Sequence, residues 1–176
     1  MKIKTALTSV AVAASLLIAQ SLTAQDNDST KVASADSDTA KGATAKLTVR
    51  HSEQYGDYVA DGEGRTLYMY TKDQQQKGNE PAESHCGLLC ERAWPPYTAE
   101  QKPEVGQGLQ ASLAGAIKGR GGKMHVTYGG WPLYYYVEDK SPGQVEGQGK
   151  DREWYLVTPD GKMSLKGVKE DAEEKK

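Results

Sequence analysis

The chain has 176 residues with 22 Lys and Arg against 24 Asp and Glu, and its large aromatic residues are ten Tyr and three Trp with no Phe. A formal net charge of −2 argues against a nucleic-acid partner, which calls for a clustered basic excess. The length fits one domain or two small ones. Because every Tyr and Trp ring carries a polar atom, each ring in a core needs a hydrogen-bond partner or water.

The N-terminal segment has the features of a secretory signal peptide. Two lysines precede an apolar run over residues 5–19, which is too short to span a bilayer, and small residues follow up to Ala24. We expect cleavage near Ala24, with an uncleaved anchor as the alternative, and a periplasmic or secreted mature protein without a transmembrane segment. The first cysteine is Cys86, so a lipobox cysteine for membrane attachment is not expected.

Residues 25–46 contain mainly Asp, Ser, Thr, Ala and Lys and are predicted to form a disordered linker. Residues 166–176 are almost wholly charged and are predicted to be a solvated tail. One domain of common size is therefore expected over residues 47–165.

Within this domain, closely spaced Gly and Pro exclude long helices. We expect strands at residues 65–71, 123–128, 131–137 and 154–158, and the Gly129-Gly130 pair predicts a tight hairpin turn between two of them. Short helical turns are expected near residues 86–90 and 109–117. The second rests on Leu109, Leu113 and Ile117, which recur at a spacing of four.

The sequence carries the same phrase twice. Tyr-x-Tyr-x-x-Asp occurs as Tyr68, Tyr70 and Asp73 and again as Tyr134, Tyr136 and Asp139, and a Trp follows each copy, at Trp94 and Trp154. Such duplication predicts a mostly β domain in which two strand-turn-strand repeats, at about residues 47–105 and 109–165, pack together.

Taken in order, these segments resemble a family of bacterial secreted-repeat proteins, often predicted lipoproteins, that is named for a Tyr-x-(Phe/Trp/Tyr)-x-x-Asp motif. The resemblance rests on residues 64–73, 86–96, 111–113, 126–136, 139, 142–143, 147–149 and 154–155. It covers nearly the whole expected domain. It implies a secreted repeat domain without an established activity. Many relatives carry a lipidated cysteine that this chain lacks, so membrane tethering is not implied.

The motif has a direct physical interpretation. Residues two apart on a strand share a face, so Tyr68 and Tyr70 point one way, and the equivalent pair does the same. Asp73 and Asp139 then lie near strand ends, where a carboxylate can bind turn amides or a Tyr hydroxyl. We expect these aspartates to latch each repeat, and a paired acidic site for a cation or ligand is the alternative.

Cys86 and Cys90 are spaced by four, a separation that one helical turn can bring within disulfide range. A local structural disulfide is the expectation, and a thiol oxidoreductase is a weaker alternative because the Cys-x-x-Cys spacing is absent. His85, Met124 and His125 are weak candidate metal ligands of a type that suits Cu(I).

No hydrolase elbow, phosphate-binding loop, zincin helix or dinucleotide fingerprint is present, so we expect neither an enzyme nor a cofactor. The first hypothesis is a non-enzymatic binding or envelope-associated module whose Tyr- and Trp-rich surface meets a protein or carbohydrate. The candidate surface residues are Trp94, Tyr97, Trp131 and Trp154. The alternative is a periplasmic copper- or haem-related carrier or redox accessory protein.

Overall fold

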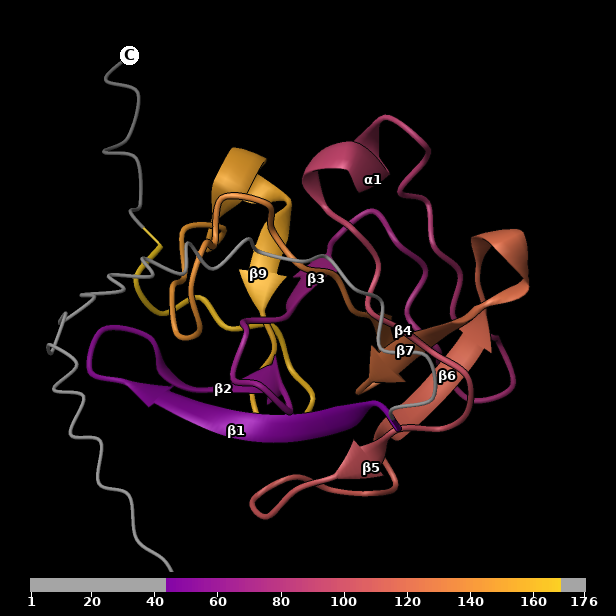
Figure 1. Cartoon of the computed structure of the whole chain (residues 1–176), viewed down its shortest axis with the longest axis horizontal. Coiled ribbons are helices and arrows are strands. Elements are labelled where there is room, and N and C mark those ends of the chain that lie inside the picture. Colours follow the sequence, from indigo (N-terminus) through magenta and orange to yellow (C-terminus); the bar gives the residue numbers. More distant parts are fainter. Residues whose placement is uncertain (1–43, 169–176) are drawn as a thin grey trace, which may run out of the picture. The chain divides into compact units, whose positions relative to one another are not determined.

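The computed structural model describes residues 44–168 (Figure 1). The expected signal peptide, nearly all of the expected linker and most of the charged tail lie outside the described residues. The first strand begins at Lys46, one residue before the expected start of the domain, and Val168 near the other end packs against the core.

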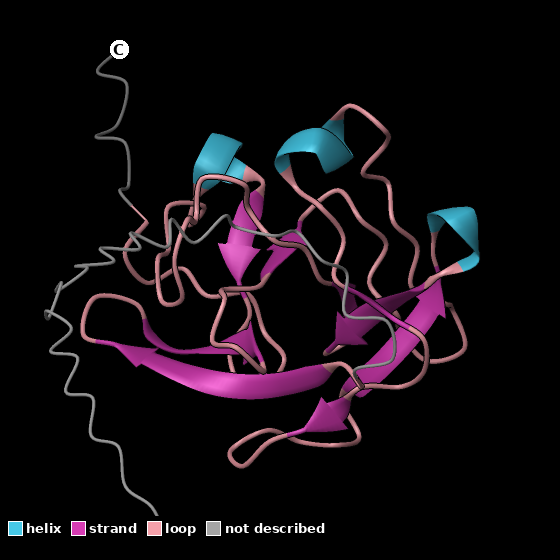
Figure 2. Cartoon of the chain, in the orientation of Figure 1, coloured by secondary structure: helices cyan, strands magenta, loops and turns pink. Residues whose placement is uncertain are grey.

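Strands and loops make up most of the described chain (Figure 2), which confirms the expectation of a mostly β fold. The helices within residues 44–168 are single turns: α1 (Cys90–Ala93), η1 (Arg120–Gly122) and η2 (Lys150–Arg152). The strands of the same region are β1 (Lys46–Ser52), β2 (Gly56–Asp61), β3 (Tyr68–Tyr70), β4 (Thr98–Ala99), β5 (Glu104–Val105), β6 (Ala114–Lys118), β7 (Met124–Tyr128), β8 (Trp131–Pro132) and β9 (Trp154–Leu156).

The strands form three small sheets, and two of these sheets combine strands from both expected repeats. Each repeat opens with an antiparallel hairpin, β1 with β2 and β6 with β7. The later strands then cross over, because β4 of the first repeat pairs with β7, and β9 of the second repeat pairs with β3. Strand β5 adds to β1 in parallel. Each repeat therefore completes a sheet of the other.

Glycines shape the turn between β7 and β8. Gly129 and Gly130 have φ values of +59° and +80°, and Tyr128 pairs with Trp131 across them, so the expected Gly-Gly hairpin turn is confirmed. A Cβ atom at Gly129 would lie 2.3 Å from the carbonyl oxygen of Gly161. Only glycine permits both this backbone conformation and this close approach.

The helical turn expected near residues 109–117 is wrong. Residues 114–118 form β6, which pairs with β7 along its whole length. Gly115 disfavours a helix, and in the strand its missing side chain leaves room for Thr127, whose Oγ1 would lie 2.8 Å from an added Cβ. Leu109 and Leu113 lie before the strand and pack against the core, so their spacing reflects loop packing.

The buried residues form two clusters. The first contains most of the aliphatic residues, among them Leu47, Val59, Leu67 and Val126. The second is largely aromatic and lies where the repeats meet, and its buried members are Tyr58, Tyr68, Cys86, Trp94, Tyr134, Val145, Trp154 and Leu156. This aromatic cluster positions the candidate site.

Candidate functional site

The two copies of the motif meet at their first tyrosines. Tyr68 and Tyr134 exchange two backbone hydrogen bonds of 2.9 Å, and both side chains are fully buried. The hydroxyl of Tyr68 donates to Asp139 Oδ2 at 2.8 Å, and that of Tyr134 donates to Asp73 Oδ2 at 2.7 Å. Each tyrosine is thus bound by the aspartate of the other repeat, rather than by the aspartate of its own.

The second oxygen of each carboxylate binds a loop amide of its own repeat. Asp73 Oδ1 accepts from the backbone N–H of His85 at 2.7 Å, and Asp139 Oδ1 accepts from that of Glu146 at 2.8 Å. Burial raises the pKa of Asp73 to about 6 and also raises the pKa of Asp139, because a low-dielectric environment disfavours the charged carboxylate. These contacts occupy both carboxylates within the protein and tie the repeats together.

The second tyrosines of the motif lie at the ends of a stack of four rings. Tyr70 stacks on Trp154 with ring centroids 4.2 Å apart, Trp154 on Trp94 at 3.9 Å, and Trp94 on Tyr136 at 4.1 Å. Each tyrosine therefore stacks on the tryptophan of the other repeat. Both tryptophans are buried, and both tyrosines are half-buried.

The expected Tyr- and Trp-rich surface is therefore mainly an internal junction. Trp94, Tyr97 and Trp154 are buried and only Trp131 is half-exposed, so these four residues do not form an exposed face. The hydroxyl of Tyr97 accepts from the amide of Lys46 at 2.9 Å and donates to its carbonyl oxygen at 3.0 Å. The physical reason is that the stacked rings are shared between the repeats and cover one another.

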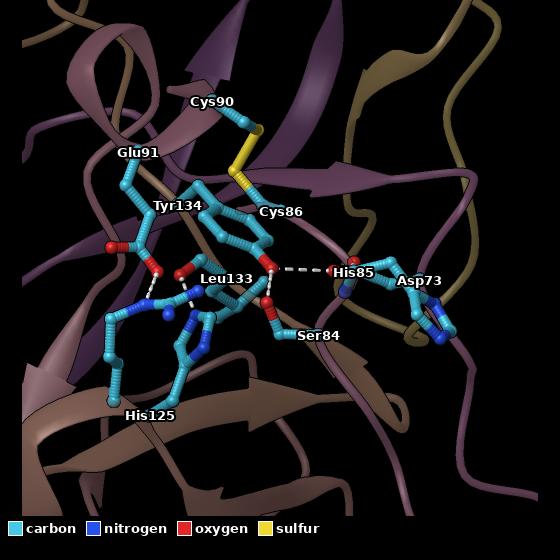
Figure 3. Close-up of a disulfide and its surroundings, with 10 residues drawn as sticks. Asp73, Ser84, His85, Cys86, Cys90, Glu91, His125, Leu133 and Tyr134 are labelled. Atoms are coloured by element: carbon cyan, nitrogen blue, oxygen red, sulfur yellow. Dashed lines mark hydrogen bonds and ion pairs between the residues drawn. A yellow bond between two sulfur atoms is a disulfide. The ribbon is translucent and has the colours of Figure 1, made fainter. Parts of the chain in front are cut away.

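Cys86 and Cys90 form the expected disulfide, with Cα atoms 5.3 Å apart (Figure 3). Helix α1 begins at Cys90, so the helical turn follows the segment expected from the spacing and overlaps it only at its end. The bridge closes the loop that leads from His85 to Glu91. Leu88 and Leu89 within this loop are 66% and 77% exposed.

A cavity of about 560 Å³ lies beside this loop. Its polar lining includes Ser84 and Glu91 from the first repeat, and Arg120 and His125 from the second. Arg120 Nε lies 3.2 Å from Glu91 Oε1, an ion pair that joins the two repeats across the cavity. The remaining lining residues are Pro81, Ala82, Glu83, Pro96, Thr98, Ile117, Lys118 and Gly119.

The inner part of the cavity borders the tyrosine–aspartate network. The hydroxyl of Ser84 lies 2.7 Å from that of Tyr134, and His125 Nε2 lies 2.7 Å from the carbonyl oxygen of Leu133 (Figure 3). The His125 ring also meets the edge of Tyr134. Burial lowers the pKa of His125, so its neutral form is favoured.

The candidate metal ligands do not converge. The His85 ring binds the carbonyl oxygen of Lys72 through Nδ1 at 2.7 Å, and Figure 3 shows it well apart from the His125 ring. Met124 and His125 are successive residues of β7, so their side chains point to opposite faces. Within the part of the chain that the structure describes, no three side chains drawn from His, Cys, Asp and Glu gather closely enough to hold a metal ion.

Sequence reasoning missed Ser84, Glu91 and Arg120 as site residues. Ser84 and Glu91 flank the disulfide loop, whereas Arg120 lies in the second repeat, and the three residues share no motif spacing. The sequence offered only an indirect indication. The expected Cys86–Cys90 disulfide lies between Ser84 and Glu91, so it constrains the positions of both residues.

The fold and the junction define a class of protein: a small, mostly β, disulfide-bonded module made from two interlocked repeats. A family model described as "secreted repeat of unknown function" matches residues 115–158. This match confirms the resemblance to the secreted-repeat family over most of the second repeat, including β7, β8 and β9. No curated protein and no solved structure matches the chain.

A secreted family and a disulfide are both compatible with a location outside the cytoplasm. Within residues 44–168, no helix has the length and apolar character that a membrane crossing requires.

Proposed function

We propose that this protein is a secreted or periplasmic, non-enzymatic binding module that holds a small ligand in the cavity between its two repeats. The observation that carries the proposal is the cavity itself, whose walls come from both repeats and whose polar residues converge from distant segments. Its volume of about 560 Å³ lies within the range of roughly 300–1,000 Å³ that small-molecule sites occupy.

The cavity is a better candidate than the aromatic junction. The first tyrosines of the motif have their hydroxyls bound inside the domain, and the two tryptophans of the stack are buried by each other and by the tyrosines. A partner that approached the stack of rings would meet Tyr70 and Tyr136, which are half-buried, rather than the two tryptophans. The duplicated motif therefore supports the site by holding its walls together.

The contacts around the cavity favour binding over catalysis. Tyr134 donates its hydroxyl proton to Asp73, so the Ser84 hydroxyl must donate to the Tyr134 oxygen. Ser84 is thereby bonded to Tyr134 rather than to His125. Burial raises the pKa of Tyr134 far above its ordinary value, so its hydroxyl stays protonated and cannot act as a general base. A nucleophile paired with a base, as covalent catalysis requires, is not assembled by these residues. We propose no cofactor.

The test is a screen of the purified, disulfide-bonded protein against a library of polar metabolites by two-dimensional amide NMR. Binding should shift the amides of Gly119 and His125, which line the cavity, and should leave those of Tyr70 and Val137 in place. Shifts confined to the Tyr70 and Tyr136 region would instead place recognition on the aromatic junction. A library without a single ligand at the cavity would contradict the proposal.

A further inference from the structure

We propose that the ligand of this cavity is a small organic ammonium, a positively charged nitrogen with N–H donors on a compact apolar body. This inference rests on the proposed function, because it names the class of ligand for the same cavity. Its basis is that three side chains of the cavity wall present hydrogen-bond acceptors and have no free donor.

The first acceptor is His125. A carbonyl oxygen accepts hydrogen bonds and cannot donate them, so the 2.7 Å contact between Nε2 and the oxygen of Leu133 assigns the ring proton to Nε2. Nδ1 of the neutral ring then carries a free lone pair. His125 lines the cavity, and no fully buried side-chain nitrogen or oxygen among residues 44–168 lacks a partner, so we infer that Nδ1 faces the cavity.

The second acceptor is Ser84. Its hydroxyl proton is directed to the Tyr134 oxygen, because the Tyr134 proton is directed to Asp73. A hydroxyl oxygen has two lone pairs, and those of Ser84 carry no hydrogen bond within the described chain. Ser84 can therefore accept from a ligand while its bond to Tyr134 persists.

The third acceptor is Glu91, which also supplies the negative charge. Its Oε1 atom binds Arg120 Nε at 3.2 Å, and its Oε2 atom carries no hydrogen bond within residues 44–168. The Glu91 side chain is 21% exposed, whereas that of Arg120 is 55% exposed. The carboxylate is therefore the less exposed member of the pair, and its Oε2 atom can accept a hydrogen bond from an ammonium in the cavity.

The charges at the rim do not oppose this assignment. Glu83 and Glu91 balance Lys118 and Arg120 among the lining residues, so the formal charges alone favour neither sign. The inner wall decides the ligand class, since His125 and Ser84 present lone pairs there and offer no free N–H or O–H donor to an anion. The apolar lining of Pro81, Ala82, Pro96 and Ile117 suits a hydrophobic body next to the charged nitrogen.

The experiment compares three probes of similar size by NMR titration of the purified protein: benzylamine, benzyl alcohol and benzoate. We expect benzylamine to bind most tightly and to shift the amides of Gly119 and His125. The Glu91→Gln variant keeps an acceptor for Arg120 but removes the charge. It should weaken benzylamine binding by about tenfold or more, because the ammonium loses a charged hydrogen-bond acceptor.

The matched control is Arg120→Gln, which removes the other member of the ion pair. It should leave benzylamine binding unchanged or strengthen it, because Glu91 becomes free for the ligand. Equal weakening of benzylamine binding by both variants would overturn the inference, because it would show that the ion pair has only a structural role. Tighter binding of benzoate or benzyl alcohol at the cavity would overturn the ammonium assignment and leave the binding function in place, whereas no binding by any probe would count against both.

Discussion

Replacing Tyr134 with phenylalanine removes one hydroxyl from the centre of the junction and keeps the ring. In the native protein this hydroxyl contacts Asp73 Oδ2 and Ser84 Oγ, each at 2.7 Å. Tyr134 is 0% exposed and Asp73 is 6% exposed, so water cannot readily replace the lost partner of the carboxylate. A hydrogen bond to a charged group is worth about 1.5–3 kcal/mol, and we expect Tyr134→Phe to lower the free energy of unfolding by about 2–3 kcal/mol.

The assay is urea unfolding followed by tryptophan fluorescence, with Tyr136→Phe as the matched variant. Tyr136 belongs to the same motif copy and stacks on Trp94, but its hydroxyl makes no hydrogen bond within the described residues. Its loss should change the free energy of unfolding by less than about 0.5 kcal/mol. A Tyr134→Phe protein as stable as the native one, or equal losses in the two variants, would refute the reasoning that the hydroxyl latches the repeats.

Three further predictions concern the stability of the same domain. Burial raises the pKa of folded Asp73 to about 6, above the unfolded value near 3.9, so its protonated form adds stability that is fully present below about pH 4 and lost as the pH rises through about 6. Between pH 4 and pH 7, the free energy of unfolding of the native protein should therefore fall by on the order of 2 kcal/mol more than that of the Asp73→Asn variant. Replacing Cys86 and Cys90 with serine should cost about 2 kcal/mol in urea unfolding, the loop-entropy value for a five-residue loop, and leave the protein folded. By thermal unfolding, Gly129→Ala should be far more destabilising than Gly121→Ala, because both have positive φ but an added Cβ meets nothing within 4 Å at Gly121.

Each of these predictions has a contradicting result. If the free energy of unfolding varied with pH in the same way for the native and Asp73→Asn proteins, burial of this carboxylate would not control the pH dependence of stability. If the variant with serine at both Cys86 and Cys90 did not fold, the disulfide would be required for folding of the domain and not only for the stability of its own loop. Equal losses for the two glycine variants would show that the close approach of residues 129 and 161 can relax.

The duplication could be predicted because each copy keeps its tyrosines, aspartate and tryptophan at matching positions. The exchange of partners between the copies could not be predicted. Tyr68 has an equivalent aspartate in each repeat, and the spacing in the sequence favours Asp73, which is nearer. The structure selects Asp139 over Asp73, because β3 and β9 pair across the repeats. Hydrogen bonding between strands, a long-range property, decided which partner was used.

This exchange explains why the first motif position holds tyrosine. A phenylalanine there would leave a buried or half-buried carboxylate of the other repeat without its tyrosine donor. The cavity was harder to predict, because Ser84, Glu91 and His125 share no pattern in the sequence. They meet only after the disulfide loop of the first repeat packs beside the hairpin of the second.

The most direct test of the account is whether filling the cavity abolishes ligand binding in a folded protein. Ile117→Trp places a large ring in the lining, and Val137→Trp, at an exposed residue outside the lining, is the control. Isothermal titration with the best ligand from the metabolite screen should show binding to the native and Val137→Trp proteins and none to Ile117→Trp. Undiminished binding to folded Ile117→Trp would contradict the claim that the cavity between the repeats is the functional site.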